Sequence, residues 1–398
     1  MNMQVHPSVL DIPNLDAAPY YEAAGWQGYL PQIRLPSGHL ATHLTGYADC
    51  KAFLADPSIS RTLCNVEDGP TFLPGPTQPE LLLNLDNPAH MRSRATVARA
   101  FSKRGLESVR QHVTDMTVHS IEQMRKGATP PDLFASVLER LTSSTVCHIL
   151  GIPEEDRQMF RPWSQMIQSA PPDDIAGIET AVTASFDYMM DFVQGRRDAH
   201  PDGFIRQYVD QRHMQEDPLT DREFVGVLLG ILLGGDHNAL SVMTKSVYTL
   251  LCAPSLWQYV RQSPDQIPRL IEELIRLIPI GKLSAFPRIT TQALQTSRGV
   301  IEANTAVYAN VFLANRDPSV FNAPLLINPG REDKAAHIQF GHGIHSCMGP
   351  ALARLEIATV LSTLVQALPN LELACDPTSI RWINGTVLRR PDELPVRF

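Results

Sequence analysis

The feature that most constrains this chain is a ten-residue run from Phe340 to Gly349, FGHGIHSCMG, directly before an apolar, helix-periodic stretch. Its three glycines have no Cβ, so the backbone can turn sharply and pass close beneath a flat ligand. Pro350, the next residue, suits the first turn of a helix. Cys347 is therefore expected at a helix N-terminus, where the partial positive charge favours a thiolate over a thiol.

These residues allow three interpretations of Cys347. An isolated cysteine is most often a small buried apolar residue. His342, His345 and Cys347 are also zinc-ligand types, but a structural zinc site normally shows paired spacing, and the sequence has no second pair. A thiolate beneath a planar macrocycle is how haem is held when electron donation is meant to cleave an O–O bond. The glycine framework favours the third interpretation, because a zinc site does not require it.

The run, continued through Ala353, Arg354 and Glu356, closely resembles the haem-binding loop of the cytochrome P450 family. The resemblance implies haem b as the cofactor and Cys347 as the ligand of its iron. It assigns to the haem loop Phe340, Gly341, His345, Cys347 and Gly349. It also implies a mainly α fold with a minor β region, in one large haem-binding domain spanning residues 1–398.

Upstream, Asp86 to Arg94 opens a predicted helix that runs to about Phe101. His90 and Arg94 are four residues apart and share a helix face, which in isolation also fits a solvated surface. The stretch resembles the family motif D-x-P-x-H-x-x-x-R, whose histidine and arginine bind a haem propionate. By the same resemblance Arg288 meets the other propionate, and His345 is a third propionate ligand.

Glu273 and Arg276 form an E-x-x-R pair, which alone indicates only a common surface ion pair. The segment that follows, from Ala314 to Arg331, resembles the family's meander, whose arginine joins that pair. Glu273, Arg276 and Arg331 are therefore predicted to form a buried structural lock. Ile327-Asn328 departs from the usual Phe-Asp of the family.

An apolar helix is predicted from about residue 221 to 251, opened by the capping box of Thr220 and Glu223. Its middle reads Gly234-Gly235-Asp236-His237-Asn238, a costly sequence inside a buried helix, which favours a functional groove over simple packing. The family usually places an acid and then an alcohol here, to relay protons. In this register His237 takes the acid position and Asn238 the alcohol position.

Asp236 lies one residue early, about 100° around the helix from the usual acid. A histidine titrates near neutral pH, whereas an amide can donate a hydrogen bond but has no titrating proton. We therefore expect His237, oriented by water or Asp236, to replace the relay and Asn238 to steady the distal ligand. In the competing account the site uses peroxide, or makes a substrate radical that couples or rearranges without oxygen insertion.

The substrate pocket is expected between residues 61–80, 232–238, 280–285 and 383–386. The residues predicted to line it are Leu233, Gly234, Lys282, Leu283 and Ile383. Lys282 is either the partner of a substrate carboxylate or a solvated surface lysine. Two helices, 154–170 and 175–193, are expected to form a lid over the pocket, and short elements are predicted at 40–45 (strand) and 47–55 (helix).

Composition limits the remaining choices. The net charge of −8 argues against nucleic acid as a general partner. The first 30 residues show neither a signal peptide nor a membrane anchor, and no run reaches about 18 apolar residues. Six cysteines without pairing rhythm fit a reduced, cytoplasmic setting. We expect a monomer.

The resemblance implies a monooxygenase that activates O₂ with electrons that come ultimately from NAD(P)H. Because the sequence holds no flavin or iron–sulfur module, these electrons would arrive through a ferredoxin reductase and a ferredoxin. The basic cluster expected to bind an acidic ferredoxin is formed by Arg92, Arg99, Lys103 and Arg104, with Arg354 nearby. The substrate would be a small organic molecule of natural-product metabolism: lipid-like, aromatic or a cyclic dipeptide, the last suggested by Phe286-Pro287-Arg288. A non-catalytic haem sensor or scaffold and a peroxygenase are the alternatives.

Overall fold

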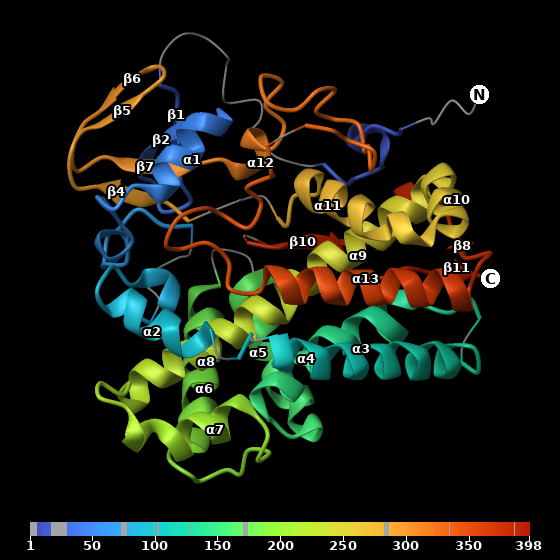
Figure 1. Cartoon of the computed structure of the whole chain (residues 1–398), viewed down its shortest axis with the longest axis horizontal. Coiled ribbons are helices and arrows are strands. Elements are labelled where there is room, and N and C mark those ends of the chain that lie inside the picture. The colour runs from blue at the N-terminus through green and yellow to red at the C-terminus, as the bar shows by residue number, and fades with distance from the viewer. Residues whose placement is uncertain are drawn as a thin grey trace.

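Helices dominate the computed structural model, which describes residues 6–16, 30–72, 78–98, 100–101, 103–127, 129–169, 174–281, 286–333, 335–385 and 387–398 (Figure 1). The α-helices are α1 Tyr47–Ala55, α2 Ala89–Ala98, α3 Lys103–Met124, α4 Glu139–Leu150, α5 Arg157–Ser169, α6 Ile175–Val193, α7 Phe204–Gln211, α8 Asp221–Gly235, α9 His237–Cys252, α10 Pro254–Gln262, α11 Ile267–Leu277, α12 Val311–Ala314 and α13 Pro350–Ala367. A π-helical turn, Phe134–Leu138, leads into α4. The predicted helices at 47–55 and 175–193 are confirmed.

The β structure is small and lies mostly at one end of the molecule (Figure 1). One sheet has the order β1-β2-β7-β4-β3, in which β2 and β7 are parallel and the other pairs antiparallel. Its strands are β1 Gln32–Arg34, β2 Leu40–Leu44, β3 Ile59–Ser60, β4 Arg288–Thr290 and β7 Ala306–Ala309. Three two-stranded antiparallel pairs complete the set: β5 Leu294–Thr296 with β6 Gly299–Ile301, β8 Glu372–Leu373 with β11 Val396–Arg397, and β9 Trp382–Asn384 with β10 Arg389–Pro391. The mainly α fold with a minor β region is confirmed.

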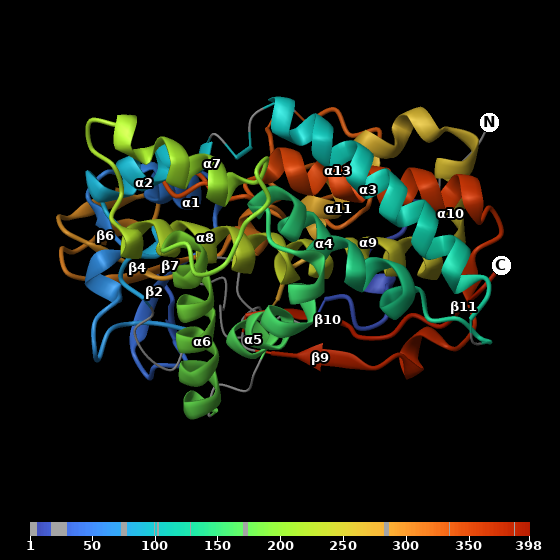
Figure 2. The same ribbon diagram turned by 90° about the horizontal axis from the view of Figure 1, so that it is seen from below.

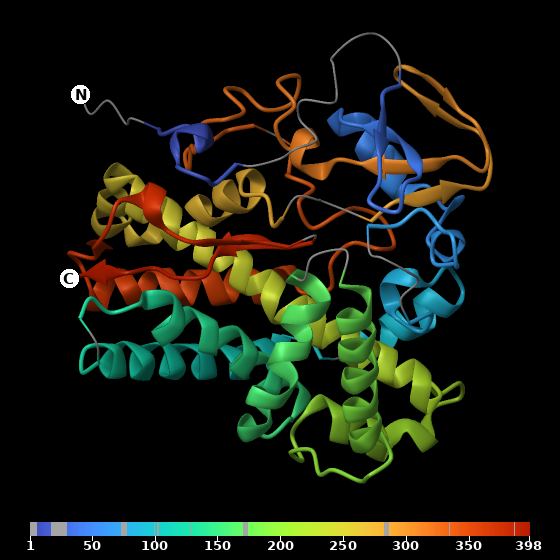
Figure 3. The same cartoon turned by 180° about the vertical axis from the view of Figure 1, so that it is seen from behind.

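The main core lies among the long helices. α13 packs along α3 and also against α9 and α11 (Figure 1). α11 buries one whole face, from Ile267 through Leu270, Ile271 and Leu274, because its apolar residues repeat every three to four positions. Seen from below, α5 and α6 stand side by side, and α6 also packs on α8 (Figure 2). From behind, the β9–β10 pair runs alongside α9 (Figure 3).

The predicted single helix over 221–251 is wrong in one respect, because it is broken. α8 begins with the expected capping box, in which Thr220 Oγ1 accepts from Glu223 N and the Glu223 carboxylate accepts from Thr220 N. It ends at Gly235, and Asp236 has φ −84° and ψ −86°, outside the helical region. Gly234 and Gly235 make the end inexpensive, since glycine has low helix propensity. The 221–252 stretch is apolar and long enough to span a membrane by composition, but 61% of its most apolar window is buried inside the fold.

The three lock residues meet as expected. Arg276 donates from Nε and Nη2 to the two Glu273 carboxylate oxygens at 2.8 and 2.9 Å. Arg331 Nε lies 3.0 Å from Glu273 Oε2, and the Asn328 backbone N–H donates to that same oxygen at 3.1 Å. All three side chains are nearly inaccessible, between 2% and 10% exposed. The Asn328 contact uses only the backbone, so the departure from Phe-Asp leaves it intact.

Candidate active site

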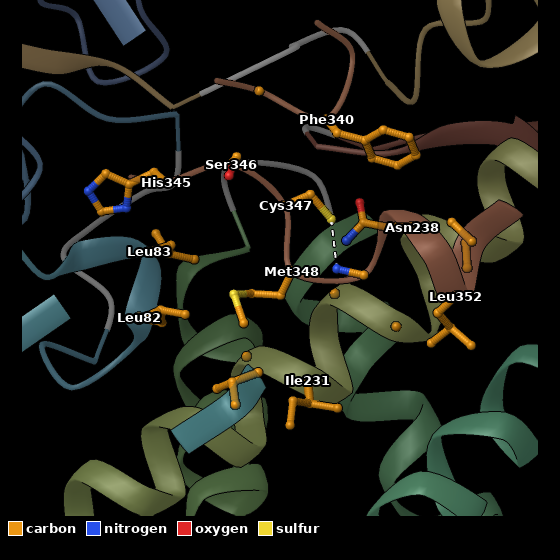
Figure 4. A pocket seen from close by; sticks show the side chains of 18 of the residues that line it. Leu82, Leu83, Ile231, Asn238, Phe340, His345, Ser346, Cys347, Met348 and Leu352 are labelled. Carbon is orange, nitrogen blue, oxygen red and sulfur yellow. Dashed lines mark hydrogen bonds between the residues drawn. The ribbon is translucent and has the colours of Figure 1, made fainter. Parts of the chain in front are cut away.

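A cavity of about 410 Å³ opens between α2, α4, α8, α9, α13 and the loop that precedes α13 (Figure 4). α8 presents one face to it through Val227, Gly230, Ile231 and Gly234, at the three- and four-residue spacing of a helix. Gly234 therefore lines the cavity as predicted. Leu233 does not line it, because it lies off that face.

The other predicted pocket residues lie elsewhere. Ile383, in β9, is not part of the cavity wall, which corrects the prediction. The turn after β9 packs instead on the end of α5, where a Cβ on Gly385 would lie 2.4 Å from the Ser169 Cα. Lys282 and Leu283 lie outside the described residues. Part of the apolar surface of the cavity wall outside the α-helices comes from Leu81, Leu82, Leu83, Ile280 and Phe286.

The glycine loop holds Cys347 against the cavity. The Cys347 N–H donates to the Phe340 carbonyl at 2.7 Å, which closes the loop on itself. Gly341 and Gly343 have φ of +75° and +72°, a region that glycine enters without strain. A Cβ on Gly343 would also lie 2.2 Å from the Leu54 carbonyl oxygen. The sequence pattern therefore encodes both the turn and the close approach.

The thiol of Cys347 is exposed, and that exposed surface faces the cavity. Although it is accessible from the cavity, the surrounding protein keeps it from bulk water, and this desolvation raises its pKa. The Gly349 N–H, which donates to Sγ at 3.3 Å, and Arg94 and Arg354 act in the opposite direction. The Gly349 N–H at the start of α13 does favour the thiolate, as expected, but desolvation is the larger effect. A coordinating metal ion deprotonates a thiol outright, so a metal partner would be needed.

One end of the cavity is lined by cationic and imidazole side chains: Arg61, His90, Arg94, Arg288 and His345. The rings of His90 and His345 lie 4.3 Å apart, and the Nε2 atom of each is buried without a hydrogen-bond partner among the described residues. Burial lowers the pKa of His90 to about 4 and that of His345 to about 2, and nearby arginines act in the same direction. Burial lowers the pKa of Arg288 to about 10, with Arg61 contributing.

Backbone carbonyls anchor these arginines but do not neutralise them. Arg94 donates to the carbonyl and the hydroxyl of Ser346 at 2.7 and 3.1 Å, which fixes the cysteine loop to α2. Arg288 donates to the Leu54 carbonyl at 3.3 Å, and Arg61 to the carbonyl of Leu83 at 3.0 Å. Buried guanidinium groups of this kind favour an anionic partner with oxygen acceptors. A carboxylate is an anion of this kind.

The helix break places its polar residues differently from the prediction. Asp236 and His237 are completely buried and do not line the cavity. Asp236 accepts from the Thr142 hydroxyl at 3.1 Å, and His237 Nε2 lies 3.6 Å from Asp236 Oδ2. Burial lowers the pKa of His237, with Asp236 acting against it and Arg390 acting with it. The expected position of His237 at the cavity is wrong, because the break rotates it behind the wall.

Asn238 does line the cavity, but its amide N–H groups are engaged within the protein. Nδ2 donates to the Leu233 carbonyl at 3.1 Å and to Gln168 Oε1 at 3.2 Å. The expectation that Asn238 donates to a distal ligand is therefore wrong for this geometry. Gln168 lies on α5, 70 residues away in sequence, and no local motif indicated it.

Sequence reasoning also missed the roles of Arg61 and Glu356 in the cavity wall. Arg61 belongs to no motif, although the pocket was expected to begin at its position. Glu356 is fully buried and lines the cavity, with the Thr145 side chain beside its carboxyl group. Burial raises its pKa to about 8, so the carboxyl holds a proton at neutral pH.

Comparison with known proteins agrees with this architecture. The family model described as Cytochrome P450 matches residues 152–394. Nocardicin C N-oxygenase of Nocardia uniformis subsp. tsuyamanensis is 33% identical over 385 residues, covering 96% of each chain. Mycinamicin IV hydroxylase/epoxidase of Micromonospora griseorubida is 34% identical over 370 residues, covering 92% of this chain and 91% of the relative. The crystal structure of cytochrome P450mel 107F1, with biaryl coupling reactivity, superposes with a TM-score of 0.90 at 28% identity, covering 96% of this chain and 97% of that one.

Proposed function

This chain belongs to the cytochrome P450 family, and on that premise we propose that it is a haem-thiolate monooxygenase acting on a small molecule of natural-product metabolism. Its relatives are named monooxygenases, hydroxylases and oxygenases. We propose one catalytic domain over residues 1–398. The cysteines are all free, which supports a reduced, cytoplasmic setting as part of the proposal.

The residues of the cavity fit haem b. Two buried imidazole nitrogens without partners among the described residues, together with the guanidinium groups, suit the two propionates, and Gly341 and Gly349 line the cavity without side chains that would take up its space. We assign the iron ligand to Cys347 and the propionates to His90, Arg94, Arg288 and His345, joined by Arg61. When bound, haem supplies the oxidising chemistry, drawing on dioxygen and on electrons from outside the chain.

The side chains of this chain would support that chemistry in separate ways. Arg94 holds the cysteine loop through Ser346, and the Gly349 N–H donates to the Cys347 sulfur, which favours its charged form. The apolar wall from Leu81 to Leu83 and from α8 excludes water from the substrate. Glu356 holds a proton at the edge of the cavity.

The observation that carries the proposal is the Cys347 residue lining a cavity that is also lined by the cationic and imidazole side chains. It is tested by the absorption spectrum of the ferrous–CO complex, in which thiolate ligation gives a red-shifted band. We expect the wild type to show that band and Cys347→Ser to lose it. Cys375→Ser is the control, since Cys375 is a half-buried cysteine outside the cavity wall. A band retained in Cys347→Ser would overturn the assignment.

The reaction we propose is insertion of oxygen into a small organic molecule, or a related oxidative coupling. Oxygen insertion is supported by the names of the N-oxygenase and hydroxylase/epoxidase relatives, and coupling by the biaryl-coupling structural neighbour. A binding difference spectrum against a panel of small natural products identifies the substrate. Absence of turnover with every compound that binds would favour the non-catalytic sensor or scaffold.

We further propose that a ferredoxin and its reductase deliver electrons from NAD(P)H. The expected docking cluster is smaller than the sequence indicated. Arg92 is paired with Asp217 at 2.9 Å and with Glu223, and Arg354 is paired with Glu272 at 2.6 Å. Arg99 and the side chains of Lys103 and Arg104 lie outside the described residues.

Charge reversal tests the remaining part of that cluster. We expect Arg99→Glu with Lys103→Glu to slow ferredoxin-driven reduction, with little effect on reduction by dithionite, because opposite charges mainly raise the association rate. Lys126→Glu, an exposed lysine just beyond the other end of α3, is the matched control. Equal slowing of both reductions, or of neither, contradicts the docking site.

Use of peroxide in place of dioxygen and electrons is a second candidate. It is favoured by one observation: Asp236 and His237 lie behind the wall, so α8 and α9 present no titrating side chain to the cavity in their described residues. Peroxide-driven turnover faster than ferredoxin-driven turnover would select this candidate. The reverse order would select the monooxygenase.

A further inference from the structure

The break between α8 and α9 leaves the carbonyl of Leu233 without a backbone donor. On either side of it, Asp236 N donates to Leu232 O at 3.1 Å and Leu240 N donates to Asp236 O at 3.0 Å. No described backbone N–H donates to Leu233 O. Two side-chain amides take that place instead: Gln168 Nε2 at 2.9 Å and Asn238 Nδ2 at 3.1 Å. Both lone pairs of the carbonyl are thereby used.

This carbonyl determines which way both amides face. A carbonyl oxygen only accepts, so the amide atom that each side chain turns toward it must be nitrogen. Gln168 Oε1 then faces Asn238 and accepts from Nδ2 at 3.2 Å. The three groups form a closed set in which every contact pairs a donor with an acceptor. The orientation of Asn238 therefore follows from the hydrogen-bond network.

Within this set Asn238 has used both of its N–H groups. Its remaining polar atom is Oδ1, an acceptor, which has no partner among the described residues. Asn238 is half-buried and lines the cavity. In the view of Figure 4, its amide lies beside Cys347 of the cysteine loop. A partly buried acceptor beside an apolar wall is costly unless a donor reaches it.

The rest of this wall is apolar. Besides Asn238, α8 and α9 contribute only glycine and apolar residues to the cavity: Val227, Gly230, Ile231, Gly234, Gly235, Ala239 and Val242. Ligand sites typically combine such apolar surface with a few placed polar groups that fix orientation. Asn238 is thus the one polar side chain that these two helices, both described throughout, offer to a ligand.

Gln168 is held firmly enough to fix this arrangement. It is 6% exposed, near the end of α5, and its backbone carbonyl accepts from the Leu388 N–H at 3.3 Å. The backbone of the next residue, Ser169, packs so closely on Gly385 that Gly385 has no room for a Cβ. The end of α5, the turn after β9 and the helix break are therefore joined at Gln168.

We propose that Asn238 Oδ1 accepts a hydrogen bond from an N–H or O–H group of the substrate, and that Gln168 is the positioning residue that turns this oxygen toward the cavity. The inference rests on the proposed function and deepens it by naming the substrate class. The substrate carries a hydrogen-bond donor that reaches this acceptor. Compounds of the same shape that offer only an acceptor there are disfavoured.

Two pairs of isosteres test the selection directly on the wild-type holoprotein. Indole and benzofuran share a shape but differ in an N–H against an oxygen acceptor, as do carbazole and dibenzofuran. Dissociation constants come from difference spectra of the ferric protein. We expect the N–H compound of each pair to bind about tenfold more tightly, the size of one hydrogen bond gained against an acceptor–acceptor contact. Binding of both pairs within twofold would overturn the proposal.

Variants then test the roles of Asn238 and Gln168 separately. Asn238→Leu is expected to bring both ratios to about one, and Gln168→Leu to reduce them, because the Asn238 amide is then free to turn over. Gln165→Leu is the matched control, since Gln165 is exposed on the same helix, and it should keep the wild-type ratios. A tenfold ratio retained in Asn238→Leu overturns the acceptor, and one retained in Gln168→Leu overturns the positioning role.

The ferrous–CO spectrum of each sample distinguishes failure of this inference from failure of the proposed function. A thiolate-type band with no isostere preference leaves the haem assignment standing and overturns the acceptor. Loss of that band in the wild type overturns the proposed function itself. If Asn238→Leu does not retain haem, the isostere affinity ratios of the wild type and of Gln168→Leu decide whether the acceptor and its positioning residue act as proposed.

Discussion

Replacing Glu273 by glutamine removes the negative charge from the buried lock while keeping its shape. In the wild type this carboxylate, 7% exposed, receives two bonds from Arg276 at 2.8 and 2.9 Å and an ion pair from Arg331 at 3.0 Å. An amide has one acceptor atom and no charge, so two buried guanidinium groups lose their counter-ion. Breaking a buried pair this way costs about 3–5 kcal/mol. Arg331 keeps Asp333 at 2.6 Å, which points to the lower end, about 3 kcal/mol.

The assay is urea unfolding of the holoprotein followed by far-UV circular dichroism. The urea m-value of a chain of 398 residues is about 3 kcal/mol/M or more, because it rises with the surface exposed on unfolding. A loss of about 3 kcal/mol therefore lowers the midpoint by roughly 1 M or less. Glu372→Gln is the control, because Glu372 and Arg397 pair at 2.6 Å but are 59% and 63% exposed. Exposed pairs contribute little, so its midpoint should not move. If Glu273→Gln and Glu372→Gln shift the midpoint equally, burial is not what gives the lock its strength.

Three further predictions concern the cavity. Gly343→Ala should lower haem retention several-fold, because the added Cβ would lie 2.2 Å from the Leu54 carbonyl oxygen. Gly38→Ala is the control, since Gly38 has a similar positive φ but open space around it, and this variant should retain haem. Equal haem retention in the two variants would show that the close approach of Gly343 to Leu54 is unimportant. Glu356 has its pKa raised from 4.5 to about 8, so its contribution to stability is complete below about pH 4.5 and is lost as pH rises through 8. The unfolding free energy of the wild type, relative to Glu356→Gln, should therefore fall across that window in urea titrations, and a constant difference would contradict the shift. His237→Ala should leave peroxide release per electron unchanged from about pH 6 to about pH 8, because the ring lies behind the wall; a rise in release would restore the relay.

Local chemistry explains what could be predicted from sequence. The turn at Gly341 and Gly343 follows from residue type, because only glycine enters positive φ there without strain. The capping box of Thr220 and Glu223 pairs residues three apart, and the bounds of α1 and α6 follow from short-range patterns. The family resemblance added the meeting of Glu273 with Arg331, which spacing alone does not give.

The amino-acid sequence by itself determined the mainly helical fold, the loop that presents Cys347 and, through family motifs, His90, Arg94, Arg288 and His345 of the cationic end, because each depends on backbone preferences or on a motif read in order along the chain. Arg61, the fifth residue of that end, belongs to no motif and was located only by the tertiary structure. Tertiary structure decided where the polar residues of the broken helix point. Asp236 and His237 turn behind the wall, whereas Asn238 lines the cavity with its Nδ2 bonded to Gln168, on another helix, and to the Leu233 carbonyl. Burial likewise sets the pKa of Cys347 and of Glu356. Desolvation and long-range hydrogen bonds depend on which elements pack together, and that information is absent from any local stretch of sequence.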